Sequence, residues 1–164
     1  MRAVHTVNEI RQSLESPRSA GQTIGLVPTM GALHSGHIRL IQTARQECGL
    51  VVVTIFVNPI QFGPTEDFGR YPRALAQDLE MCRVSGADLV FAPALEEMYP
   101  VPSLTFVDVP RVSEHLCGAF RPGHFRGVAT VVLKLFNIVR PARAYFGEKE
   151  AHPLAVIRTM APNL

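Results

Sequence analysis

The stretch VPTMGALHSGH, residues 27–37, joins the end of an apolar run to a segment with helical spacing and holds two histidines. Gly31 and Gly36 let the backbone bend and approach a ligand closely. A helix that follows would offer unpaired N–H groups and a positive dipole end, which suit phosphate. Because His34 precedes that helix and His37 lies in its first turn, both rings can face one anion site. The alternative is a strand-to-helix turn that carries two surface histidines.

The segments on either side of this stretch alternate between strand and helix patterns. Residues 23–28 predict a strand that Pro28 stops, and the apolar run 50–57 predicts a strand buried on both faces. Ser35 is the expected N-cap of the next helix, and Gly49 follows its end. The other expected strands cover residues 88–93, 104–109 (at an edge) and 144–147, and the expected helices cover 6–16, 36–48, 72–84, 128–139 and 153–160. This alternation predicts an α/β fold with a doubly wound parallel sheet.

The bulk composition is that of one globular domain spanning residues 1–164. Hydrophobic residues make up 47% of the chain and charged residues 18%, so disorder is not expected. A net charge of +2 gives no reason to expect nucleic acid or a membrane surface as a partner. Cys48, Cys82 and Cys117 lack paired metal-ligand spacing, which favours free thiols in a reducing compartment. No apolar run is long enough to span a bilayer, and we expect a cytoplasmic protein.

Two further polar clusters follow expected strands, and ligands collect at the carboxyl ends of the strands in such sheets. In the first, Asn58 and Gln61 carry amides that both donate and accept hydrogen bonds. Asn-Pro is also ordinary turn chemistry, so the residues alone favour a structural Asn58 and leave Gln61 undecided. In the second, Lys149 suits a polyphosphate and Glu150 could hold Mg²⁺, although a solvated charge pair at a helix start is the simpler interpretation.

The segment RPGHFRGV, residues 121–128, groups Arg121, His124 and Arg126 around two glycines. It predicts either a substrate loop or a polar connection, and the pattern assigns no role to the individual side chains.

The HxGH pattern at His34–His37 resembles the signature of the nucleotidyltransferase superfamily that shares the HIGH motif with class I aminoacyl-tRNA synthetases. In that group the histidines hold ATP phosphates and the reaction occurs at the α-phosphate. With VVVTIFVNPIQF, DLVFAP, VDVP, RPGHFRGVATVVLKLFNIVRP and YFGEK, the stretch resembles the pantothenate synthetase (pantoate–β-alanine ligase) family in order and spacing. The resemblance runs from about residue 24 to residue 160.

This resemblance implies a Rossmann-like domain that binds ATP and pantoate. The family joins pantoate to β-alanine through a pantoyl adenylate, at the expense of ATP, and releases AMP and pyrophosphate on the route to coenzyme A. It therefore implies ATP, pantoate and β-alanine as small-molecule substrates, Mg²⁺ with the nucleotide, and a possible homodimer.

The resemblance also implies roles for individual residues. His37 stands where the family has a general acid, and His34 and Lys149 would act with it on the phosphates. Asn58 and Gln61 would bind pantoate and β-alanine, and Glu150 would lie near the metal. The implied ATP contacts are Met30, Gly31, Ala32, Leu33, His34, Ser35, Gly36, His37, Gly147, Glu148, Lys149 and Glu150.

The chain also departs from the family pattern. Pro153 stands where the family has a second pantoate-binding glutamine, and Glu150 replaces an aspartate. Family members continue past this point into a Ser-Ser-Arg segment and a lid-like C-terminal domain, so we expect these 164 residues alone to be weakly active or inactive. Two alternatives stay open: another HxGH nucleotidyltransferase with a different acceptor, which Pro153 favours, and a non-catalytic module that binds nucleotide or dimerises.

Overall fold

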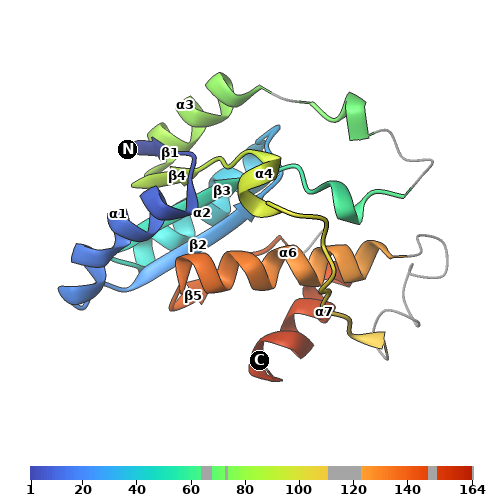
Figure 1. The fold of residues 1–164 in the computed structure, drawn as a ribbon. Helices are drawn as coiled ribbons and strands as arrows, with labels where there is room; N and C mark the ends of the chain where they lie inside the picture. Colours follow the sequence, from blue (N-terminus) through green and yellow to red (C-terminus); the bar gives the residue numbers. More distant parts are fainter. Residues whose placement is uncertain (64–67, 73, 111–122, 148–150, 164) are drawn as a thin grey trace.

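The described strands form a five-stranded sheet in the order β1-β4-β3-β2-β5, and every pairing in it is parallel (Figure 1). The computed structural model describes residues 1–63, 68–72, 74–110, 123–147 and 151–163, and for residues 70, 151–153 and 163 it describes the backbone alone. The strands are β1 (Arg2–Val4), β2 (Ile24–Thr29), β3 (Leu50–Ile55), β4 (Leu89–Phe91) and β5 (Arg143–Ala144). The helices are α1 (Val7–Ser19), α2 (Ser35–Glu47), α3 (Leu75–Ser85), α4 (Leu95–Met98), α6 (His124–Val139) and α7 (Ala151–Met160), and the short 3₁₀ turns are η1 (Pro59–Gln61), η2 (Phe68–Arg70) and η5 (Ala161–Asn163).

Helices cover both faces of the sheet, and alternate residues of each strand enter different cores. Leu26 and Val52 pack in the larger core with residues of α1, α6 and α7. Val27 and Val53 point the other way, into the core formed with α2 and α3. The predicted doubly wound α/β fold is therefore confirmed.

The order of the strands creates a switch point at β2. From β2 the chain steps through β3 to β4 in one direction, and β5 then adds to the other side of β2. Crevices at such points bind ligands in open α/β sheets, and the loop that leaves the carboxyl end of β2 holds the histidine motif.

The prediction that Pro28 ends its strand is wrong, because β2 continues to Thr29. The carbonyl groups of Ile24 and Leu26 accept hydrogen bonds from Ala142 and Tyr145 on the β5 side. Alternation along the strand turns Pro28 toward that same side. Since β5 pairs only with Gly25 and Leu26, the missing N–H of Pro28 lies beyond the end of β5, where no ladder bond is lost.

Residues 104–109 are not the expected edge strand. The segment lies along α6 instead: the Val107 N–H donates to Thr130 Oγ1 at 2.9 Å, and Arg126 stacks 4.6 Å over the ring of Phe106. Val107 and Val109 pack against the larger core, so the alternating pattern reflects burial against a helix rather than sheet pairing.

Several predicted boundaries are also wrong. Helix α3 begins at Leu75 rather than at residue 72, and α6 begins at His124 rather than at residue 128, because its polar first turn escapes a search for apolar spacing. The strand expected at 144–147 is only Arg143–Ala144, and β1 and α4 are too short for periodicity to detect. Among the described helices, none combines the length and apolar character needed to cross a membrane.

Candidate functional site

The loop after β2 is shaped by a buried carboxylate that the sequence motif does not contain. Asp78, in the first turns of α3, is 2% exposed. Its Oδ2 accepts the Ala32 N–H at 3.0 Å and its Oδ1 accepts the Leu33 N–H at 2.8 Å. Gly31 and Ala32 both adopt positive φ angles, of 82° and 50°. The N–H groups of Ala32 and Leu33 are therefore already bonded within the protein. The imidazoles are then the main polar groups that this loop offers to a ligand.

Gly31 is required at its position on two counts. Its φ angle lies in the left-handed region, which disfavours side chains. A Cβ there would also lie 2.9 Å from Asp78 Oδ2 and 3.2 Å from the Ile55 side chain. The close packing of Asp78 under the loop depends on this glycine.

His34, not Ser35 as expected, is the N-cap of α2. Its Nδ1 accepts the Gly36 N–H at 3.1 Å, and Nδ1 of His37 accepts the His34 N–H at 3.3 Å, which completes a capping box made of two imidazoles. Ser35 cannot take this role, because it is itself the first residue of α2. Since both Nδ1 atoms act as acceptors, the proton of each neutral ring sits on Nε2. The ring centroids lie 4.2 Å apart.

The environment of His37 favours its neutral form. Burial lowers the pKa of His37 below the usual 6.5, and the neighbouring His34 lowers this pKa further, while the charge of Asp78 raises it. A neutral ring with its Nδ1 already bonded can offer one Nε2–H donor. The pair can therefore supply two hydrogen-bond donors at the start of a 13-residue helix.

The second cluster meets the first at Met30. Gln61, 9% exposed, directs its Nε2 at the sulfur of Met30, 3.2 Å away. Asn58 is 1% exposed, and its Nδ2 donates to Gln61 Oε1 at 3.0 Å and to the Gly127 carbonyl at 3.1 Å. Its Oδ1 accepts the Tyr99 hydroxyl at 2.9 Å. Asn58 thus holds the oxygen end of the Gln61 amide, and the nitrogen end of this amide lies beside the histidine loop.

Residues outside the predicted site complete this cluster. A Cβ on Gly127 would lie 2.6 Å from the Ile60 carbonyl oxygen and from Gln61 Cα, so only glycine allows α6 to approach the η1 turn this closely. His124 Nδ1 lies 2.8 Å from the Gln61 carbonyl oxygen, which gives the RPGHFRGV segment a structural role at the site. Arg121 lies outside the described residues. A charged residue on the otherwise buried stripe of α3 is the signal that could have revealed Asp78 from the sequence.

The third predicted cluster lies outside the described residues except for Gly147. Glu148, Lys149 and Glu150 lie outside the described residues, and Pro153 belongs to the part of α7 described by its backbone alone. A Cβ on Gly147 would meet nothing within 4 Å. Within the described part of the chain, no three His, Cys, Asp or Glu side chains gather as a metal site would require.

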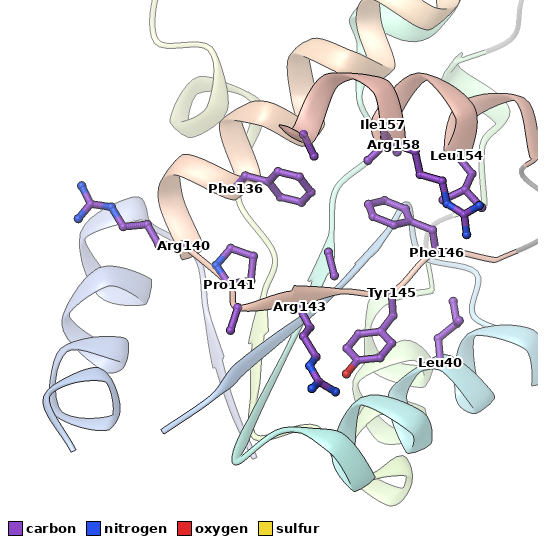
Figure 2. Close-up of a pocket in the computed structure, with 13 residues that line it drawn as sticks. Leu40, Phe136, Arg140, Pro141, Arg143, Tyr145, Phe146, Leu154, Ile157 and Arg158 are labelled. Carbon is purple, nitrogen blue, oxygen red and sulfur yellow. The ribbon is translucent and has the colours of Figure 1, made fainter. Parts of the chain in front are cut away.

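A separate cavity of about 640 Å³ lies between the end of α6, β5 and α7. Figure 2 shows Phe136 and Phe146 facing each other across it, with Tyr145 and Arg143 projecting from the β5 side. None of the predicted site residues that the structure describes lines this cavity. The candidate site is therefore the edge that holds His34, His37 and Gln61.

The fold and the paired imidazoles define a Rossmann-like domain of the HIGH-motif nucleotidyltransferase type. The family model described as Pantoate-beta-alanine ligase matches residues 2–164, and the chain belongs to this family. This confirms the resemblance stated from the motifs.

Close relatives and solved structures agree with this assignment. The chain is 54% identical to a pantothenate synthetase of Fervidobacterium nodosum and 56% identical to one of Sinorhizobium medicae, over all of this chain and 59% and 56% of those proteins. The pantothenate synthetase crystal structure from Thermus thermophilus superposes with a TM-score of 0.93 at 50% identity, covering 99% of this chain and 58% of that one. A pantoate-beta-alanine ligase of Francisella tularensis, complexed with beta-gamma ATP and beta-alanine, gives 0.93 at 38% identity over 99% and 62%. The chain thus spans less than two thirds of the length of these relatives.

Proposed function

We propose that this chain takes part in the ATP-dependent ligation of pantoate and β-alanine to pantothenate, with release of AMP and pyrophosphate. The observation that carries the proposal is the placement of two imidazoles, and of the Gln61 amide that contacts Met30 of the same loop, at the switch point of the sheet. The names of the relatives support it, as do the nucleotide and β-alanine complexed with the Francisella enzyme.

In the first step the pantoate carboxylate attacks the α-phosphate of ATP, and pyrophosphate leaves as pantoyl adenylate forms. The Nε2–H groups of His34 and His37 would donate hydrogen bonds to phosphate oxygens, and the dipole of α2 would favour the same charge. Because the pKa of His37 is lowered, hydrogen bonding by the neutral ring is favoured over transfer of a proton from an imidazolium. Residues Gly147–Glu150, with Lys149, would make the second set of phosphate contacts.

In the second step the β-alanine amine attacks the activated acyl group, and AMP leaves. Gln61 would hold the pantoyl group through its Nε2 donor and so keep the acyl carbon near the nucleotide. Holding reactants in place supplies much of the rate in such reactions, since a carboxylate becomes a good acyl donor once it carries the adenylate.

Mg²⁺ would enter with the nucleotide rather than occupy a site built from the described residues, which hold no group of three metal-ligating side chains. Mg²⁺ typically binds one or two carboxylates together with substrate phosphates, so a single Glu150 fits that pattern. When bound, the ion would neutralise phosphate charge.

A cytoplasmic location and a homodimer are part of this proposal. Cys48 and Cys82 are buried free thiols, which agrees with a reducing compartment. Sedimentation velocity of the purified chain tests the dimer directly.

A pyrophosphate-release assay tests the function, with ATP binding measured by calorimetry beside it. We expect ATP and pantoate to bind, and we expect any pyrophosphate release by this weakly active chain to require both of them, with pantothenate formed only once β-alanine is added. Release with another acid but not with pantoate would instead indicate a different HxGH nucleotidyltransferase. ATP binding without turnover and without pantoate binding would indicate a nucleotide-binding module, and absence of ATP binding would overturn the proposal.

A further inference from the structure

We propose that Tyr99 is a positioning residue that acts through Asn58 to fix the orientation of the Gln61 amide, so that the site presents an N–H donor to its acid substrate. Neither Tyr99 nor Asn58 needs to touch the ligand. The identity of the ligand rests on the proposed function, whereas the orientation of the amide does not.

The Gly127 carbonyl sets the direction of both amides, because it can only accept hydrogen bonds, and the Tyr99 hydroxyl adds the bond that keeps Asn58 in that direction. The carbonyl oxygen lies 3.1 Å from Asn58 Nδ2, so Asn58 must turn its amino group toward α6. The same nitrogen donates its other hydrogen to Gln61 Oε1 at 3.0 Å. Gln61 therefore directs Nε2 away from Asn58, toward Met30. Reversing either amide would bring two acceptors or two donors together.

Tyr99 completes the network from α4's C-terminal end. Its hydroxyl donates to Asn58 Oδ1 at 2.9 Å, which satisfies the remaining polar atom of an amide that is 1% exposed. Burial raises the pKa of Tyr99, so the phenol keeps the proton that it donates. The ring is held between Phe56, with centroids 6.2 Å apart, and the Lys134 ammonium, 4.9 Å from the Tyr99 ring centroid.

Without the Tyr99 hydroxyl, Asn58 Oδ1 would be a buried acceptor with no partner. Burying an unpaired polar atom is unfavourable, and the Asn58 amide would lose one of the bonds that hold its orientation. Gln61 would then populate other side-chain orientations and offer its donor for only part of the time.

The partner that Nε2 now has is weak. A thioether sulfur is a poor acceptor, whereas a carboxylate oxygen accepts a stronger, charge-assisted bond. A ligand carboxylate or hydroxyl oxygen would therefore replace Met30 at Gln61. A ligand that offers only a donor at this point would meet Nε2–H and be rejected.

The test is Tyr99→Phe, which keeps the ring, with Tyr145→Phe as a matched control. The Tyr145 hydroxyl contacts Glu47 and Cys48, and Tyr145 lines the separate cavity. We expect Tyr99→Phe to raise the KM for pantoate about two- to tenfold, the range that one neutral hydrogen bond supports, with the KM for ATP unchanged. A uniform loss of kcat and both KM values would indicate a general structural role and overturn the proposal.

A second readout needs no turnover. In proton–nitrogen spectra, the Gln61 side-chain amide is identified as the pair of signals lost in Gln61→Ala. We expect this pair to shift or broaden in Tyr99→Phe and to stay unchanged in Tyr145→Phe. Unchanged Gln61 signals in Tyr99→Phe overturn the proposal. If the signals respond but Gln61→Ala leaves the pantoate KM unaltered, the acid site of the proposed function fails and the positioning role of Tyr99 stands.

Discussion

Replacing Asp78 with asparagine tests whether this carboxylate holds the histidine loop. Asparagine keeps the shape but retains only one acceptor oxygen, while its amino group would face one of the two N–H donors of Ala32 and Leu33. The loop cannot easily rearrange to pair the N–H group that loses its acceptor, because Gly31 and Ala32 already occupy left-handed conformations and the Leu33 side chain is buried.

The expected loss follows from these contacts. A hydrogen bond to a charged group is typically worth about 1.5–3 kcal/mol, and a buried donor left unpaired costs about 1–3 kcal/mol. Because these two effects overlap, we expect Asp78→Asn to lower the free energy of unfolding by about 2–4 kcal/mol. The chain contains no tryptophan, so urea unfolding followed by far-ultraviolet circular dichroism is the suitable measurement.

Glu80→Gln is the matched control on the same helix. Glu80 is exposed and pairs only with Arg83 in the contacts described, three residues away, so we expect no measurable change in stability. Asp78→Asn should also lower the pKa of His37 further, since it removes a charge that raises this pKa. Equal stability of the two variants, together with an unchanged His37 titration by NMR, would refute the role of Asp78.

Three further predictions use other parts of the site. Because the pKa of folded His37 lies below 6.5, the stability that neutral His37 contributes is complete above that pH and is lost as the pH falls through the folded value. In urea titrations, His37→Gln should therefore lessen the fall in the free energy of unfolding as the pH drops below 6.5. Gly127→Ala forces a Cβ within 2.6 Å of backbone atoms and should lower the thermal midpoint, whereas Gly49→Ala, whose nearest neighbour is at 3.5 Å, should not. Pro153→Gln should tighten pantoate binding about two- to tenfold in calorimetry with a non-hydrolysable ATP analogue, and unchanged tight binding would show that Gln61 suffices.

The sequence predicted the layers of the fold because burial leaves a periodic trace. The run at 50–57 is apolar almost without interruption, and β3 is indeed covered on both faces. Pro28 misled the prediction because its effect depends on which neighbour its missing N–H would face, and that neighbour, β5, is about 115 residues away in the chain and ends early. The segment 104–109 misled it because alternation reports that one side of a segment is buried and does not identify the covering element.

The site was predictable where a motif carries its own geometry. Two histidines at a helix start can cap that helix locally, so spacing alone predicted that the rings of His34 and His37 lie together, although the capping residue was placed one position late. The only local signal of Asp78 is a charge on the buried stripe of α3, and Tyr99 carries none. Neither sequence position indicates its partner, because the partners are 45 and 41 residues away. Asp78 and Tyr99 reach these partners only because α3 and the end of α4 pack against the two loops.

This division between motif and support has a consequence for how the site works. The donors that would meet the substrates come from the two motifs, but the orientation of each donor is determined from outside them: Asp78 of α3 ties down the histidine loop, and the Gly127 carbonyl of α6 turns the Asn58 and Gln61 amides. An imidazole or an amide has two ends with opposite hydrogen-bonding character, so its presence alone does not decide what it recognises. A chain that kept both motifs but lost Asp78 and Gly127 would keep the residues that mark the family without the geometry that makes them selective.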